Sequence, residues 1–301
     1  EAARLSAREA AAYGVNTTFG PMVDLSRDPR WGRAVEGAGE DVRLATCFAG
    51  ARVRGFRAGG LMVATKHYAG YGFGEGGRDY GPVEMGEAFL RDRVLPPFHA
   101  AIQEGGEFVM AAFNTLNGVP VTADKRMLGD VLRGDLGFRG VVMSDWGAIA
   151  QLAQHGLSQD PVKLTAIAFN AGIDLDMAAR YYLAHLATAV ERGLVKRAAV
   201  DAAVRRVLRT KFAARLDEKM DVTPEKTART LAEIAPEVRA ASIRTAAESV
   251  VLLRNERNRL PLAGVRRIAL VGGLADSAQD HMAYGPARAS VAEVVTLRRA
   301  I

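Results

Sequence analysis

Short apolar runs alternate with longer helical patterns along most of this chain of 301 residues. The apolar runs, which predict strands, lie near 17–23, 61–65, 108–113, 141–144 and 172–175. The helical patterns lie near 40–57, 87–104, 125–134, 161–170 and 180–192. An order of strand, helix, strand, helix is typical of a parallel sheet joined by right-handed crossovers. The pattern therefore predicts an α/β fold.

Polar residues follow the predicted strands at the point where each strand ends. They are Asp24, Lys66 with His67, Asn114, Asp145 and Asp176. In a (β/α)8 barrel the carboxyl ends of the strands carry the chemistry. Because all of these residues follow the carboxyl ends of strands, the pattern favours a barrel, with an open doubly wound sheet as the alternative.

The strand at 141–144 carries the strongest candidate. Its Val-Val-Met run lacks polar alternation, which is typical of a parallel strand buried on both faces. The chain then places Asp145 directly before Trp146. A carboxylate at such a strand end is a catalytic candidate, although Ser and Asp also begin helices as N-caps.

Lys66 and His67 end the strand near 61–65, and two titratable side chains in that place indicate a pocket. A Schiff-base lysine of an aldolase-type barrel and a plain surface pair are the alternatives. The other histidines show no metal-ligand spacing, and Cys47 is the single cysteine. We therefore expect no metal site.

A loop at 28–33 places Arg30 and Arg33 beside Trp31, and an arginine offers a rigid fork of donors to vicinal hydroxyls or a carboxylate. The alternative is a turn held by Asp28. The acids from Glu36 onward favour the start of a helix and are expected to be mainly structural. The G-x-G-x-x-G match at 72–77 is not expected to bind a dinucleotide, because no helix follows it.

A domain boundary is predicted after the helical pattern at 195–216. We expect a partial barrel over 1–216 and a linker with helices over 217–248, with helix near 231–247. Strands at 249–253 and 267–271 predict the beginning of a second α/β domain over 249–301. The chain starts without Met and ends inside a pattern, so we expect a piece of a longer protein.

The charge pattern bears on partners. The net charge of +6 arises from 40 basic and 34 acidic residues, which are interleaved along helices rather than gathered in a tail. This favours a solvated mixed surface over nucleic-acid binding. No apolar run approaches the ~20 residues that cross a bilayer, so membrane insertion is not expected.

Together these motifs resemble the glycoside hydrolase family 3 β-glucosidases, especially those of the bacterial periplasmic type. The resemblance is carried in order along nearly the whole chain. The matching segments are 19–24, 27–33, Glu36 with 39–41, 64–68, 75–80, 114–120, 137–146, 171–177, 250–255, 260–262 and 273–276.

The resemblance implies a (β/α)8 barrel followed by an α/β sandwich, with the active site between them. It implies a retaining, exo-acting hydrolase that releases β-D-glucose from the non-reducing end of β-glucosides through a covalent glycosyl-aspartate. Asp145 would be the nucleophile, with a pKa lowered by Lys66 or Arg33. Arg33, Lys66 and His67 would bind sugar hydroxyls, and Trp146 would line the sugar site. No cofactor is implied, and the location is periplasmic or secreted.

The chain also departs from the family pattern. The first barrel strands would precede Glu1, and the general acid/base glutamate would follow Ile301, so this piece alone could be inactive. A catalytically inactive sugar-binding fragment and a β-xylosidase of the same family are the alternatives. Phe113 stands where many relatives have a tyrosine near the nucleophile. The segment 68–85 lacks the histidine of the N-acetylglucosaminidase branch.

Overall fold

The computed structural model describes residues 1–216, 218, 222–282 and 291–301. They form two compact units, Glu1–Ala247 and Glu248–Ile301.

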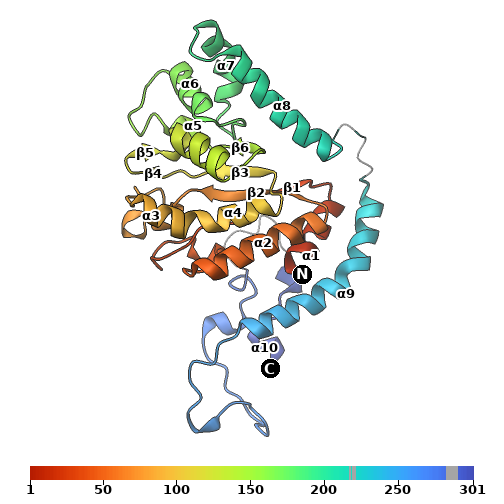
Figure 1. Ribbon diagram of the computed structural model, residues 1–301. Helices are drawn as coiled ribbons and strands as arrows, with labels where there is room; N and C mark the ends of the chain where they lie inside the picture. The colour runs from red at the N-terminus through yellow and green to blue at the C-terminus, as the bar shows by residue number, and fades with distance from the viewer. Residues whose placement is uncertain (217, 219–221, 283–290) are drawn as a thin grey trace. The chain divides into compact units, whose positions relative to one another are not determined.

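A parallel sheet lies at the centre of the first unit (Figure 1). Its strands, in the order β1-β2-β3-β6, are β1 (Thr17–Thr18), β2 (Met62–Tyr68), β3 (Phe108–Ala111) and β6 (Val141–Met143). The predicted α/β class with a parallel sheet is therefore confirmed. Among the described residues the sheet is open, because four strands cannot complete a barrel of eight. A small antiparallel pair, β4 (Thr115–Leu116) and β5 (Val119–Pro120), lies apart from it.

The predicted strand at 172–175 was wrong, because only Leu175 forms an isolated bridge, to Met143. The reason lies in the side chain of Asp174, whose Oδ2 accepts the Val142 N–H at 3.0 Å. That bond takes the place of a backbone ladder bond and interrupts the pairing. The segment still holds β6, because the Ser144 N–H donates to the Leu175 carbonyl at 2.9 Å.

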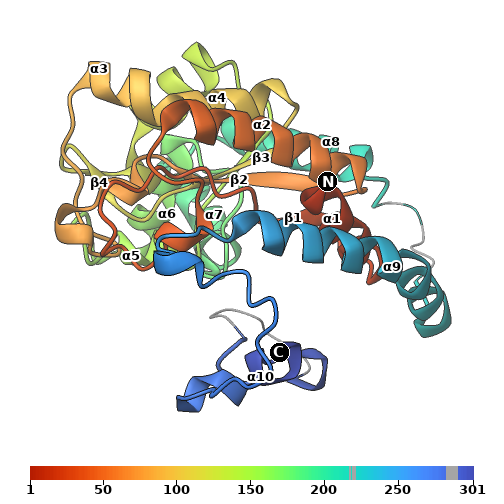
Figure 2. The same cartoon turned by 90° about the horizontal axis from the view of Figure 1, so that it is seen from below.

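The helix predicted at 125–134 is a π-helix, Arg126–Asp135. The α-helices of the first unit follow most of the other predicted patterns. They are α1 (Ala2–Ala12), α2 (Val42–Ala58), α3 (Glu87–Phe89), α4 (Leu95–Gln103), α5 (Ala148–Gln151), α6 (Pro161–Ala171), α7 (Tyr181–Glu191), α8 (Arg197–Ala213) and α9 (Pro224–Ser249). Helix α2 begins after Asp41, whose carboxylate accepts the Leu44 N–H at 2.6 Å as an N-cap. Figures 1 and 2 show α2 and α4 side by side along the sheet.

The buried core fixes the strand that carries Asp145. Val141 and Val142 of β6 are fully buried, as the unbroken apolar run predicts. Val142 packs in a cluster with Leu128, Leu132 and other aliphatic side chains. Full burial of each such side chain stabilises the fold by about 1.5–3 kcal/mol, so β6 has a rigid setting.

The second unit differs from the prediction. Neither 249–253 nor 267–271 is a strand, and Val250 to Leu253 have largely exposed side chains. A strand requires a neighbour to pair its N–H and C=O groups, and the described residues of this unit supply none. They form short 3₁₀ turns and α10 (Leu297–Ala300) instead.

The helix predicted near 231–247 is confirmed within α9. Residues 217 and 219–221 of the predicted linker region at 217–248 lie outside the described residues. No helix in the described parts of the chain has the length and apolar character that crossing a bilayer requires.

Candidate active site

A buried histidine lies at the carboxyl end of the sheet. His67 is 1% exposed and sits near the end of β2, where Met22 and Lys66 form a parallel bridge. Its Nδ1 lies 2.7 Å from Oδ2 of Asp24, and its backbone N–H donates to the same oxygen at 2.9 Å. Asp24 is equally buried, with a side chain 1% exposed. The Asp24 carboxylate therefore fixes the position of the His67 ring through its Nδ1 edge.

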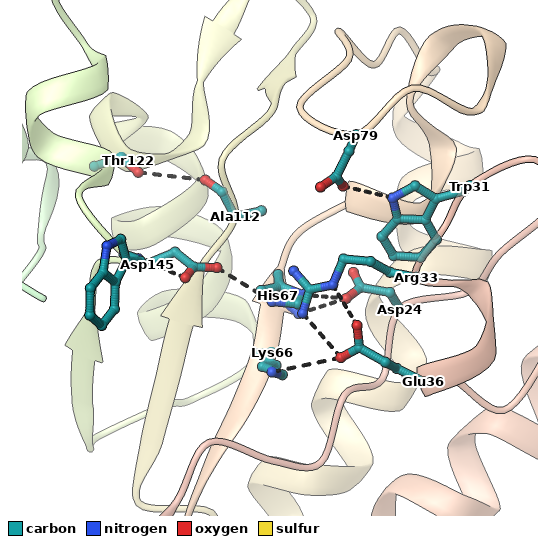
Figure 3. A network of polar contacts seen from close by, with 11 residues as sticks. Asp24, Trp31, Arg33, Glu36, Lys66, His67, Asp79, Ala112, Thr122 and Asp145 are labelled. Carbon is teal, nitrogen blue, oxygen red and sulfur yellow. Dashed lines mark hydrogen bonds and ion pairs between the residues drawn. The ribbon is translucent and has the colours of Figure 1, made fainter. Parts of the chain in front are cut away.

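The opposite edge of the same imidazole faces the predicted nucleophile. His67 Nε2 lies 3.4 Å from Oδ2 of Asp145, whose side chain is 11% exposed. Figure 3 shows the ring between the two carboxylates, with Asp24 on one side and Asp145 on the other. The site therefore contains two carboxylates that share one imidazole.

Two cations meet at a third acid beside this pair. Arg33 Nε donates to Glu36 Oε1 at 2.6 Å, and Arg33 Nη2 lies 3.1 Å from Oε2. Lys66 Nζ lies 3.9 Å from the same Oε2 (Figure 3). Glu36 thus orients both cationic side chains toward one region.

Aromatic rings pack beside these groups. The Tyr71 ring lies 5.0 Å from the His67 ring and 5.3 Å from the Trp31 ring, both edge-on. Trp31 donates its indole N–H to Asp79 at 2.9 Å, as Figure 3 shows. Phe113 lies 4.5 Å from the ring of Tyr80 and is nearly buried. These rings limit the water around the polar cluster.

The turn after β6 presents Asp145 by backbone contacts. Asp145 Oδ1 accepts the Trp146 N–H at 2.6 Å, and Gly147 follows in the left-handed region at φ 67°. The N-cap residue of α5 is Gly147, and no side chain caps this helix. Asp145 therefore has no capping role. The Ser144 hydroxyl accepts the Met177 N–H at 2.9 Å and ties the turn to the next segment.

Burial dominates the electrostatics of the site. Desolvation raises the pKa of Asp145 above its ordinary value, although His67, the Trp146 N–H, Arg33 and Lys66 each act to lower it. Arg33 and Lys66 act on the pKa of Asp145 in the expected direction, but the effect of burial is larger and the net shift of the pKa is upward. Desolvation, followed by the charge of Arg33, lowers the pKa of Lys66 against the opposing acids Glu36, Asp145 and Asp24.

The predicted site residues have different surroundings. Arg33 and Lys66 meet at Glu36, and His67 meets Asp145. The charges of Arg33 and Lys66 act on Asp145, so these two groups form one electrostatic network. Trp146 follows Asp145 directly and is 70% exposed, so its indole is open to solvent.

Arg30 lies outside this network. It pairs with Asp28 at 2.6 Å on an exposed turn, which is the structural alternative considered for it. The sequence placed Asp24 among the polar residues at the strand ends but gave it no role in the site. Glu36 was interpreted as a helix-start acid, so its place in the network was missed.

No group of three or more His, Cys, Asp or Glu side chains that could hold a metal ion occurs in the described part of the chain. The glycine-rich segment at 72–77 forms two short 3₁₀ turns, Tyr71–Phe73 and Glu75–Gly77. It therefore lacks the strand-to-helix setting of a dinucleotide site.

A parallel sheet with a buried carboxylate, an imidazole and two cations at its carboxyl edge defines an α/β protein with a candidate site in the usual place for such sheets. Residues 1–210 match the family model described as "Glycosyl hydrolase family 3 N terminal domain". The chain belongs to glycosyl hydrolase family 3, which confirms the resemblance found in its motifs.

Curated relatives agree with this assignment. The chain is 40% identical to the "Periplasmic beta-glucosidase" of Salmonella typhimurium, over 99% of this chain and 41% of the relative. It is 36% identical to a "Putative beta-xylosidase" of Formosa agariphila, over 89% of this chain and 37% of the relative. The chain thus spans about two fifths of the length of these relatives.

Solved structures give the same result. A β-glucosidase from Listeria innocua in complex with isofagomine superposes with a TM-score of 0.87 at 38% identity, over 92% of this chain and 40% of that one. A mutant of the Listeria enzyme in complex with laminaribiose gives a TM-score of 0.88, over 92% of this chain and 39% of that one.

Proposed function

We propose that this protein is a retaining, exo-acting glycoside hydrolase that releases β-D-glucose from the non-reducing end of β-glucosides. The observation that carries the proposal is the buried carboxylate of Asp145, 3.4 Å from His67 and close to two cations at the carboxyl edge of a parallel sheet. Family membership and relatives named β-glucosidases support it.

Asp145 is the proposed nucleophile. Retaining hydrolysis requires one ionised carboxylate to attack the anomeric carbon and one protonated acid to assist departure of the leaving oxygen. The attack forms a glycosyl–aspartate ester as the glycosidic bond breaks, and water then cleaves the ester. The general acid is expected from the second domain of the full protein, as the resemblance implies.

The cationic side chains are proposed to bind the sugar. Arg33 and Lys66 would donate to vicinal hydroxyls, and Glu36 fixes the direction of both. His67 would contact the ring beside Asp145, and the open indole of Trp146 would cover the sugar face. An aldolase role for Lys66 is less well supported, since family 3 relatives give it no backing.

The finer architecture belongs to the same proposal. We assign 1–216 to part of a (β/α)8 barrel, 217–248 to a linker with helices and 249–301 to the beginning of an α/β sandwich domain. The Listeria neighbours, solved with glucose and with laminaribiose, support a carbohydrate substrate. The name of the Salmonella relative supports a periplasmic or secreted location.

Two alternative functions are considered. Two relatives from Formosa agariphila, at 36% and 30% identity, are named "Putative beta-xylosidase" and "Beta-xylosidase", which supports a β-xyloside as an alternative substrate. A sugar-binding role without turnover would follow if no acid/base residue completes the site. Comparing kcat/KM for aryl β-glucosides and aryl β-xylosides decides between a β-glucosidase and a β-xylosidase. Binding of either sugar without turnover would indicate a sugar-binding role.

Proton NMR of the first product from an aryl β-glucoside tests the mechanism. The proposal predicts that β-glucose appears first and then mutarotates. Initial release of α-glucose would contradict retention.

A further inference from the structure

Asp24 has a place in the site that its sequence position alone does not explain. One carboxylate oxygen, Oδ2, serves both the backbone N–H and the Nδ1 atom of His67, at 2.9 and 2.7 Å. The other oxygen, Oδ1, is buried and has no hydrogen-bond partner among the described residues. A buried carboxylate is costly unless bonded, so its main compensation here is the histidine.

The strand geometry explains why the two residues meet. The Val23 N–H donates to the Lys66 carbonyl at 2.8 Å, and the Lys66 N–H donates to the Pro21 carbonyl at 3.1 Å. This pairing places the residue after Val23 beside the residue after Lys66. Asp24 therefore contacts His67 through backbone register, independently of any substrate.

The contact determines which nitrogen of the imidazole is free. A neutral histidine carries one N–H, and the hydrogen bond made by one nitrogen determines the state of the other. With Nδ1–H donated to Asp24, Nε2 points to Asp145 Oδ2 at 3.4 Å. The ring is also enclosed edge-on by Tyr71 at 5.0 Å, so it has little freedom to turn.

We infer that Asp24 is a positioning residue for the reaction. It keeps His67 protonated at Nδ1 and oriented so that the lone pair of Nε2 can accept a hydrogen bond from the hydroxyl of the sugar beside Asp145. Asp24 does not touch the substrate and acts through His67. The inference rests on the proposed function for its kinetic consequence, whereas the state of the ring is a property of the free protein.

Two variants separate charge from hydrogen bonding. Asp24→Asn keeps the shape and one acceptor oxygen but loses the charge, and Asp24→Ala loses both. At metal sites, removing the hydrogen-bond partner of a ligating histidine typically costs 10–100-fold, and we take the same scale for His67. We expect kcat/KM to fall about 10–100-fold in Asp24→Ala, mostly through kcat, and less in Asp24→Asn. Asp160→Asn, which alters the remote N-cap of α6, serves as a control and should leave kcat/KM unchanged.

A double-mutant cycle tests whether Asp24 acts through His67. In a His67→Gln background, Asp24→Asn should change kcat/KM by less than about threefold. An equal loss in both backgrounds would overturn the inference, because a merely structural role would not depend on the imidazole. If Asp24→Ala does not fold, the isosteric Asp24→Asn still completes the cycle.

Nitrogen-15 NMR of the histidine ring gives a reading that needs no turnover. The full chain should show His67 protonated at Nδ1, and Asp24→Asn or Asp24→Ala should change the ring signals. A wild-type spectrum with Nδ1 unprotonated would overturn the inference. Absence of β-glucosidase turnover together with the predicted spectrum would reject the proposed function and leave the positioning of His67 supported.

Discussion

His67 and Asp145 approach to 3.4 Å although their strands, β2 and β6, are not neighbours in the sheet. Strand β3 lies between them, so the contact crosses the end of an intervening strand. Parallel strands end at one edge, and long polar side chains from different strands can converge there. The arrangement gives specific expectations for substitution.

Asp145→Ala or Asp145→Gly should lower turnover by roughly 10⁴–10⁶-fold, the scale seen when a nucleophile is removed. Substrate binding should persist, because Arg33, Lys66 and His67 remain. Added azide should restore part of the rate by filling the vacated space and give a glycosyl azide of inverted configuration. Unchanged turnover in either variant would exclude Asp145 as the nucleophile.

Asp145→Asn should raise the melting temperature at neutral pH while removing turnover. Burial raises the pKa of Asp145 in the folded state, so that state binds the proton more tightly than the unfolded chain does. The contribution of Asp145 to the free energy of unfolding therefore falls as the pH rises from its unfolded-state pKa of about 3.9 through its raised folded-state pKa. The gain from Asn should be full above this window and vanish below it. Calorimetry at several pH values checks this, and a lower melting temperature at pH 7 would contradict it.

Glu36→Gln should raise KM for the glycoside more than it lowers kcat. Gln keeps the shape but weakens the charge-assisted hydrogen bonds from Arg33, each worth about 1.5–3 kcal/mol. It also removes the negative charge that lies 3.9 Å from Lys66. Because Glu36 is partly exposed, we expect the lower end, roughly a tenfold rise in KM. Glu87→Gln, which alters an exposed pair with Arg91, is the matched control and should leave KM unchanged.

Asp174→Ala should destabilise the first unit strongly. The Asp174 side chain is 2% exposed and pairs with Arg133 at 2.7 Å and Arg206 at 2.6 Å. Removing one member of a buried ionic group leaves uncompensated charge and costs about 3–5 kcal/mol. Asp201→Ala removes an exposed carboxylate paired with Arg197 and should cost less than about 1 kcal/mol. Denaturant unfolding of both variants measures the difference, and equal losses would contradict it.

The sequence was informative where burial leaves a pattern. The apolar run of β6 predicted a strand covered on both faces because such strands have no solvent-facing residues to alternate. Asp145, Lys66 and His67 could be selected because titratable groups seldom end an apolar strand without facing a pocket. Their mutual contacts required the fold.

Other features depend on tertiary partners that no local pattern encodes. Asp174 interrupts a strand because its side chain bonds β6 and Arg206, which lies on α8. Glu36 appeared to be a helix-start acid, yet it pairs with Arg33, three residues before it, and with Lys66 of β2. The contact with Lys66 depends on the fold. The apolar runs at 249–253 and 267–271 have strand composition, but a strand forms only against a neighbour.

The most direct measurement of the central claim is covalent trapping by a 2-deoxy-2-fluoro-β-glucoside with a good leaving group. The fluorine slows both formation and hydrolysis of the glycosyl ester, whereas the good leaving group speeds its formation alone, so the intermediate should accumulate. Proteolysis and mass mapping of the inactivated full-length protein should place the label on Asp145. A label on another carboxylate, such as Asp174 or Asp176, would contradict the assignment of the nucleophile.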